Sequence, residues 1–177
     1  MKRYFLKNGS EAAIFRANTD DIPAISEIYD GARRFMRSVG NTEQWSNGYP
    51  SKDDSMRDVA DGILYKVTVG NIIAAVFCML RTPEPTYEIV YFGSWEGDAP
   101  YTTVHRIAVA EGFRSLGVAG ICFDFALEVF GEVRADTHRD NIPMQRALIS
   151  NGFAYRGIIY LKNGDERLAY QKIQRKS

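Results

Sequence analysis

The chain has 177 residues, of which 45% are hydrophobic and 25% are charged, a composition typical of one soluble globular domain. A domain of this length buries about two-thirds of the surface of its unfolded chain, so it needs no metal or disulfide for stability. Its 22 Lys and Arg balance its 22 Asp and Glu, which excludes a general electrostatic attraction to nucleic acid or to anionic membranes.

The first predicted elements are a short strand and two helices. Residues 12–17 (AAIFRA) are expected to form the strand, and residues 1–12 are a candidate N-terminal extension. Residues 18–40 then carry isoleucines at helical spacing, and three residues before them can cap a helix: Asn18, Thr19 and Asp20. After a loop rich in Asn, Gly and Pro, Ser51 can cap a second, short helix.

Strands are predicted to dominate the middle of the chain. Residues 63–69 and 71–80 read as a hairpin joined at Gly70 and Asn71, and the second of these strands is apolar throughout. The alternating stretch YEIVYFG, residues 87–93, is expected to be a further strand or an extended arm. Residues 101–109 (YTTVHRIAV) form the next predicted strand.

The last third of the chain alternates between helix and strand. A helix over 118–130 is followed by a strand over 132–138, a helix over 141–152 and a hairpin that turns at Asn163 and Gly164. The whole order predicts one α/β domain over residues 1–177, with a mixed central sheet of about six to seven strands flanked by about four helices. A regular doubly wound sheet is not predicted, because its strands and helices would alternate throughout the chain.

The two cysteines and the hydropathy of the chain bear on its compartment. Cys78 and Cys122 each lie inside an apolar run, so we expect buried, inert thiols and no disulfide framework. The longest apolar run, Ile72 to Leu80, is too short to span a bilayer, and the N-terminus does not resemble a secretory signal. The expected location is the cytoplasm.

The stretch RSLGVAG, Arg114 to Gly120, stands between a predicted strand and a predicted helix. The first turn of a helix has unpaired N–H groups and a partial positive charge, and glycines let an anion approach them closely. Three phosphate-binding loops compete here. A nucleotide P-loop would need Lys-Ser/Thr after Gly117, where this chain has Val118-Ala119. A dinucleotide turn would need G-x-G-x-x-G, a spacing that the glycines at 112, 117 and 120 do not have. The third is a diphosphate cradle for a coenzyme A thioester.

The segment IAVAEGFRSLGVAG resembles the acetyl-CoA motif of the GNAT superfamily of N-acetyltransferases, in which [Q/R]-x-x-G-x-[G/A] opens a helix. Here that motif is Arg114 to Ala119. Three other segments are similar to family elements in the same order: IFRANTDDIPAISEIY, THRDNIPMQRALISNGF and RLAYQKI. The resemblance covers residues 13–173, about nine-tenths of the chain, and it implies a GNAT-like domain.

The resemblance implies acetyl-CoA as cosubstrate and a set of residues that bind it. The diphosphate would lie on the backbone N–H groups of Arg114, Ser115, Leu116, Gly117, Val118, Ala119 and Gly120. The pantetheine arm would lie along the strand residues Ile107, Ala108 and Val109, much as an added strand does. Asn141 matches a family position that contacts this arm, and an equally good interpretation is a helix N-cap.

The implied reaction needs a neutral amine, which a base must provide because alkyl amines are protonated at neutral pH. His105 lies on the motif strand, on the same face as Ile107 and Val109, and is the candidate base or part of a proton relay. A structural or substrate-orienting imidazole is the alternative. Many family members carry a tyrosine that protonates the departing thiolate, and here that place holds Leu148, so the general acid is left open.

The acceptor site is predicted from aromatic residues that can contact an amine by apolar and cation–π interactions, namely Trp45, Tyr49, Tyr87, Trp95 and Tyr101. Each could equally be ordinary core. The predicted function is acetyl transfer to a primary amine on a small molecule or peptide, and the alternative is a CoA-binding sensor without turnover. Neither a metal nor nucleic acid nor a membrane is an expected partner, and a homodimer is left open.

Overall fold

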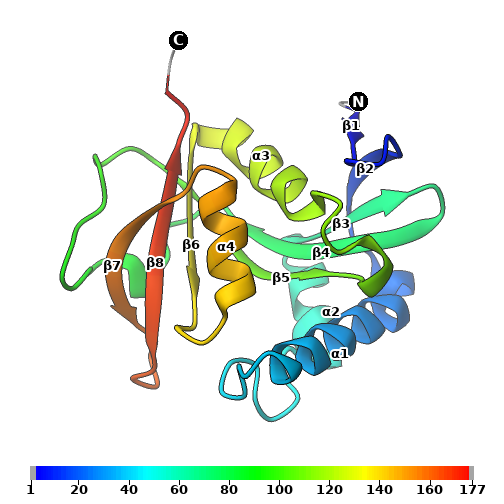
Figure 1. The fold of residues 1–177 in the computed structure, drawn as a ribbon, viewed down its shortest axis with the longest axis horizontal. Helices are drawn as coiled ribbons and strands as arrows, with labels where there is room; N and C mark the ends of the chain where they lie inside the picture. The colour runs from blue at the N-terminus through cyan, green and yellow to red at the C-terminus, as the bar shows by residue number, and fades with distance from the viewer. Residues whose placement is uncertain (1–2, 176–177) are drawn as a thin grey trace. The chain divides into compact units, whose positions relative to one another are not determined.

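The computed structural model describes residues 3–175. Its contacts divide the chain into two compact units, Met1–Met79 with Arg106–Cys122, and Leu80–His105 with Phe123–Ser177. The strand β5 (Thr102–Val109) and the helix α3 (Val118–Phe130) each contribute residues to both units (Figure 1).

The first unit is a sheet with two helices. Its strands follow the order β1-β2-β3-β4-β5, and neighbours from β1 to β4 run antiparallel. The helices α1 and α2 lie next to each other (Figure 1). The bounds are β1 Tyr4–Phe5, β2 Glu11–Arg16, α1 Ile22–Ser38, α2 Lys52–Ala60, β3 Leu64–Val69 and β4 Ile72–Leu80.

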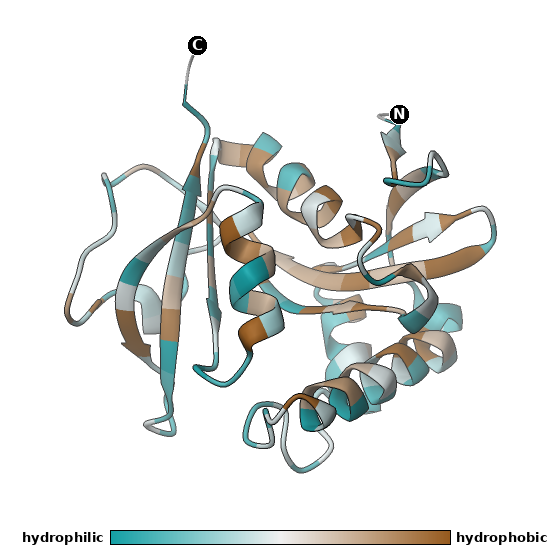
Figure 2. Cartoon of the chain, in the orientation of Figure 1, coloured by the Kyte–Doolittle hydropathy of each residue, from teal (hydrophilic) through white to brown (hydrophobic). Residues whose placement is uncertain are grey.

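Capping side chains and buried apolar faces explain these elements. Asn18 caps a short 3-10 helix, Thr19–Asp21, which leads directly into α1. Ser51 caps α2, because its hydroxyl accepts a hydrogen bond from the Asp54 N–H while the Asp54 carboxylate accepts one from the Ser51 N–H. The strand β4 is buried over most of its length. Its residues are hydrophobic, as the brown colour in Figure 2 shows, which suits a strand in the interior of a sheet.

The second unit combines the start of β5 and the rest of α3 with three further strands and a helix. Its strand order is β5-β6-β8-β7. β5 runs parallel to β6, with Thr102 opposite Val133 and Thr103 opposite Arg134, and the other pairs are antiparallel. The bounds are β6 Glu132–Thr137, α4 Ile142–Ser150, β7 Ala154–Tyr160 and β8 Glu166–Ile173.

The described residues hold eight strands and four helices in a mixed order, which confirms the α/β class. The sheet has more strands than the six to seven predicted because Tyr4–Phe5, inside the candidate N-terminal extension, pairs with β2. The stretch 87–93 is an arm and not a strand. It follows a 3-10 turn, Pro85–Tyr87, and makes one bridge from Tyr91 to Ile158. One domain over residues 1–177 stays a prediction.

Two further expectations concern the membrane and the thiols. Within residues 3–175, no helix has the length and apolar character that a bilayer span requires. Cys78 and Cys122 are both buried and free, as predicted from the apolar runs around them.

Candidate active site

The loop between β5 and α3 is shaped by two residues with left-handed backbone angles. Ser115 has a φ of 65° and Gly117 a φ of 87°. Only glycine adopts this region without a steric cost, so Gly117 permits the turn that starts α3. The loop is fixed to the first unit at its beginning, where the Ala110 N–H donates to the Ala74 carbonyl at 2.9 Å.

The first turn of α3 presents open amides. Within residues 3–175, the N–H groups of Val118, Ala119 and Gly120 have no acceptor. The Ile121 N–H is the first that donates, to the Gly117 carbonyl at 3.4 Å. These three donors and the helix dipole together favour a bound anion. The Arg114 and Leu116 N–H groups instead make turn bonds of 3.3 and 3.4 Å to carbonyls within the loop.

The Arg114 side chain anchors the loop to α1. Its guanidinium donates to the Gly31 carbonyl at 3.1 Å and lies 4.3 Å from the centre of the Phe35 ring. Both contacts are within the first unit. The charge of Arg114 is therefore held against α1 as a fixed part of the loop, and the backbone of the loop is what remains for a ligand.

Lys7 lies beside the same loop, and no sequence pattern indicated this. Its N–H donates to the Leu116 carbonyl at 3.0 Å, and its side-chain stem passes Gly117, where an added Cβ would stand 3.5 Å from the Lys7 Cγ. Lys7 is exposed, and no acidic side chain of the described chain pairs with it. An exposed cation thus stands next to the open amides of α3.

In β5 the residues predicted to border the pantetheine arm follow a strained position. Arg106 has a φ of 52°, a left-handed value that costs a non-glycine residue about 1–3 kcal/mol. Ile107 and Val109 are half-buried, whereas Ala108 between them is buried. Alternation along the strand therefore places Ile107 and Val109 on the more accessible face.

The strained backbone at Arg106 is held by a cluster of side chains in the first unit. Its Nη1 lies 2.6 Å from both carboxylate oxygens of Asp58, which is 5% exposed. Its Nε donates to the Tyr49 hydroxyl, and its carbonyl accepts from the Tyr29 hydroxyl at 3.2 Å. Trp45 packs edge-on against Tyr29 at 5.5 Å. Two of the predicted acceptor aromatics, Trp45 and Tyr49, thus belong to the cluster around Arg106.

His105, in the second unit, lies between two carboxylates. Its Nε2 is 3.4 Å from Glu84 Oε2, and its Nδ1 is 3.6 Å from Asp136 Oδ1. The hydrogen bond with His105 lowers the pKa of Glu84 to about 2, so Glu84 is a carboxylate at neutral pH. The Tyr87 hydroxyl donates to Asp136 Oδ1 at 2.6 Å and fixes the second carboxylate. This arrangement can accept a proton and pass it on.

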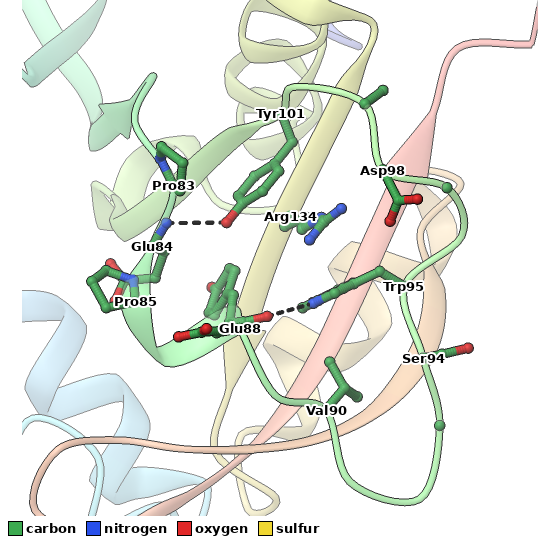
Figure 3. A pocket seen from close by; sticks show the side chains of 14 residues that line it. Pro83, Glu84, Pro85, Glu88, Val90, Ser94, Trp95, Asp98, Tyr101 and Arg134 are labelled. Atoms are coloured by element: carbon green, nitrogen blue, oxygen red, sulfur yellow. Dashed lines mark hydrogen bonds between the residues drawn. The ribbon is translucent and has the colours of Figure 1, made fainter.

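A pocket of about 680 Å³ lies in the second unit, and it brings together the other three predicted aromatics (Figure 3). The Trp95 Nε1–H donates to the Tyr87 carbonyl at 2.7 Å, and the Tyr101 hydroxyl accepts from the Glu84 N–H at 3.0 Å. Carboxylates share the lining with these rings. The lining includes Glu84, Tyr87, Glu88, Trp95, Asp98 and Tyr101.

Arg134 also lines this pocket and was not identified from the sequence. It is 5% exposed, and its Nε donates to Glu132 Oε1 at 2.7 Å. Its guanidinium lies 3.8 Å from the centre of the Tyr101 ring and 4.4 Å from that of Trp95, so it sits between the two rings (Figure 3). The available signal was weak, because Arg134 lies in a strand of mixed polarity, EVRADT, and the sequence does not show that its side chain is buried.

Asn141 and Leu148 lie on α4. The Asn141 side chain accepts from the Met144 N–H at 3.2 Å, which confirms the N-cap interpretation. Its predicted contact with pantetheine stays a prediction. Leu148 is almost fully buried and has no group that could donate a proton to a thiolate.

No protein-family model matches the chain, and no curated protein matches it. Solved structures do match. An acetyltransferase of the GNAT family from Streptococcus agalactiae 2603 is 32% identical with a TM-score of 0.87, over 99% of this chain and 100% of that one. A second GNAT-family acetyltransferase, from Listeria monocytogenes 4b F2365, is 19% identical with a TM-score of 0.72, over 97% of this chain and 99% of that one.

A third solved structure, yncA from Salmonella typhimurium with its cofactor acetyl-CoA, is 12% identical with a TM-score of 0.61, over 94% of this chain and 95% of that one. At such low identity this likeness and that to the Listeria protein show the fold alone. The 32% identity to the Streptococcus protein spans the full length of both chains. On that evidence, the chain belongs to the GNAT family of acetyltransferases.

Proposed function

We propose that this acyltransferase moves an acetyl group from acetyl-CoA to a primary amine. The observation that carries the proposal is the set of open amides of Val118, Ala119 and Gly120, directly after the motif arginine. An exposed cation, Lys7, stands beside them. A diphosphate fits this combination of donors and positive charge, so the residues present suit the expected cosubstrate.

The chain's own groups have separate tasks in holding the donor. The amides at the start of α3 would bind the diphosphate, with Lys7 adding an exposed charge. The accessible face of Ile107 and Val109 would bind the pantetheine arm, and the cluster around Arg106 would hold the backbone before them. When bound, acetyl-CoA supplies an acetyl group activated as a thioester.

The proton of the amine is the second requirement. An alkyl ammonium has a pKa of about 10.4, so a group of the protein must accept its proton near neutral pH. In the proposed arrangement His105 accepts it, directly or through Glu84. Asp136 then faces the second ring nitrogen and, held by Tyr87, orients the imidazole. Since Leu148 cannot act as an acid, either another group protonates the thiolate or it leaves as the anion, which a thiol of pKa about 8.5 allows.

The acceptor is proposed to lie in the pocket of the second unit. Aromatic faces at Tyr87, Trp95 and Tyr101 suit an ammonium through cation–π attraction, and the carboxylates Glu84 and Glu88 suit its charge. Glu84 belongs both to this lining and to the contact with His105. An amine bound at Glu84 is thus close to the group that takes its proton.

The test follows thiol release from acetyl-CoA with a panel of amines and peptides. We expect turnover above the uncatalysed rate for at least one acceptor. His105→Gln should lower kcat by about 10²–10⁴-fold, the usual contribution of a positioned proton acceptor. His138→Gln is the matched control, because His138 is the other histidine and its Nδ1 contacts Asp140, from whose N–H it accepts at 3.2 Å and whose Oδ2 lies 3.5 Å away. Absence of release with every acceptor would contradict the proposal.

The second candidate function is a CoA-binding sensor without turnover, and the observation that favours it is Leu148 in place of the family's tyrosine. Calorimetry separates the two candidates. Tight CoA binding with no thiol release over the whole panel would support the sensor, and release with any amine would exclude it.

A further inference from the structure

We propose that the pocket of the second unit binds a carboxylate on the Nη groups of Arg134, so that the acceptor carries an amine and a carboxylate in one small molecule. The amine half of this inference rests on the proposed function. The carboxylate half rests on the pocket alone. The expected ligands are therefore amino acids and related amino carboxylates.

Arg134 is a buried cation whose donors are mostly unused. A guanidinium has five N–H donors, and the only one of these that donates to a group of residues 3–175 is the Nε–H, to Glu132. The two Nη groups lie at the lining of the pocket (Figure 3). Neither Nη is a fully buried atom, so both can be reached from the pocket, and a carboxylate from a ligand could accept two charge-assisted hydrogen bonds from them at once.

The surroundings hold this guanidinium in one orientation. The guanidinium carbon lies over the rings of both Tyr101 and Trp95, and these two contacts restrict its movement. On the other side, Gln171 Nε2 donates to the same Glu132 oxygen at 2.7 Å and so fixes the partner of Arg134. A planar fork that is already oriented matches a carboxylate in two-point geometry with little loss of side-chain entropy.

The charges of the lining explain why one ligand should carry both groups. Three carboxylates line the pocket, Glu84, Glu88 and Asp98, so an acid without an amine would be repelled. An amine without an acid would leave the Arg134 Nη donors to water and would gain no charge-assisted hydrogen bond from them. A molecule with both groups satisfies both ends, and a volume of about 680 Å³ is in the range of about 300–1,000 Å³ that is usual for small-molecule sites.

The first test needs no variant and uses the full chain without coenzyme. Free L-amino acids and their C-terminal amides are titrated into the protein by calorimetry. We expect at least one acid to bind about 10–150-fold more tightly than its amide, which is the usual value of charge-assisted hydrogen bonds. Equal affinity within every pair, no binding of any acid, or tighter binding of diamines than of amino acids would each overturn the inference.

The second test uses variants of the pocket. Arg134→Lys keeps the charge beside Glu132 but loses the fork, so it should remove most of the preference for acid over amide and leave amide affinity nearly unchanged. Arg139→Gln, an exposed arginine paired with Glu166, is the control that should keep the preference. An unchanged preference in Arg134→Lys would contradict the role of the guanidinium.

The outcomes also separate this inference from the proposed function. Acid-selective binding without any thiol release would support the carboxylate site and refute the transferase. Thiol release with equal kcat/KM for acids and their amides would support the transferase and refute the carboxylate site.

Discussion

The ion pair between Asp58 and Arg106 gives the sharpest prediction about the fold, and Asp58→Asn is the perturbation. The change removes the negative charge and leaves the Arg106 guanidinium, whose side chain is 25% exposed, without its main partner. Two N–O contacts of 2.6 Å are weakened at a site where Asp58 is 5% exposed. Removing one partner of a buried pair costs about 3–5 kcal/mol.

We take the lower end of that range, about 3 kcal/mol, because Arg106 keeps its hydrogen bond to Tyr49 and part of its contact with water. For a chain of this length each kcal/mol lowers the Tm by about 2–4 °C, so the expected loss is about 6–12 °C. Urea unfolding followed by circular dichroism measures the free energy, and a thermal scan measures the Tm.

Asp61→Asn is the matched control, because Asp61 is exposed at the end of the same helix and should change stability by less than about 0.5 kcal/mol. Combining Asp58→Asn with Arg106→Gln should cost less than the sum of the single changes, since no lone charge remains. The reasoning is refuted if Asp58→Asn unfolds within about 0.5 kcal/mol of the wild type.

Three further predictions concern single groups. Lys7→Ala should weaken CoA binding about two- to fivefold and reduce its salt dependence, as expected for the loss of one exposed ion pair. Calorimetry measures the affinity, and an unchanged value would contradict a contact between Lys7 and the diphosphate. Hydrogen bonds with His105, the largest cause, and with Thr86 lower the pKa of Glu84 from 4.5 to about 2. These contacts therefore stabilise the fold fully above pH 4.5, and that stabilisation is lost as the pH falls from there to about 2. Glu84→Gln should therefore flatten the unfolding free energy over that range, and an unchanged acid limb would exclude the coupling. Burial raises the pKa of Cys78 and Cys122, so a thiol reagent should label neither in the native protein and both after unfolding.

The sequence was sufficient to predict the elements whose ends are set by residues close together in the chain. Ser51 and Asp54 form the expected capping interaction, and α3 spans 118–130 as predicted, since its apolar face starts after Gly117 and Gly131 follows its end. The two hairpins turn at their Gly-containing pairs. Each of these rules depends on residues a few positions apart, which is why sequence alone could supply them.

The arm at residues 87–93 shows where local rules stop. Its alternation is compatible with a strand, but strand formation depends on an available edge. The backbone here touches β7 too closely for a regular ladder, because a Cβ at Gly93 would stand 1.9 Å from the Arg156 carbonyl. One bridge, from Tyr91 to Ile158, replaces the ladder. Sequence spacing carries no information about that approach.

The missed site residues share a different cause. Lys7 meets Leu116, Asp58 meets Arg106, and Tyr101 meets Arg134, each across a long stretch of chain. A charged residue that becomes buried needs a partner, but the sequence identifies neither the burial nor the partner. Three of the five predicted aromatics, Tyr87, Trp95 and Tyr101, line one pocket, and their role toward an acceptor stays a prediction. The guanidinium beside two of these rings could not be foreseen from the sequence.

Buried charge is itself an argument about function here. A buried ion pair is weak evidence for stability, because apolar residues of the same volume often stabilise a fold as well or better. The Arg106 pair has an evident structural task, since it holds a left-handed backbone within β5. The Arg134 pair has no comparable task, as the backbone around it pairs regularly with its neighbours on β5 and β8. Its free donors face a pocket, which is the placement expected of a residue that serves a ligand.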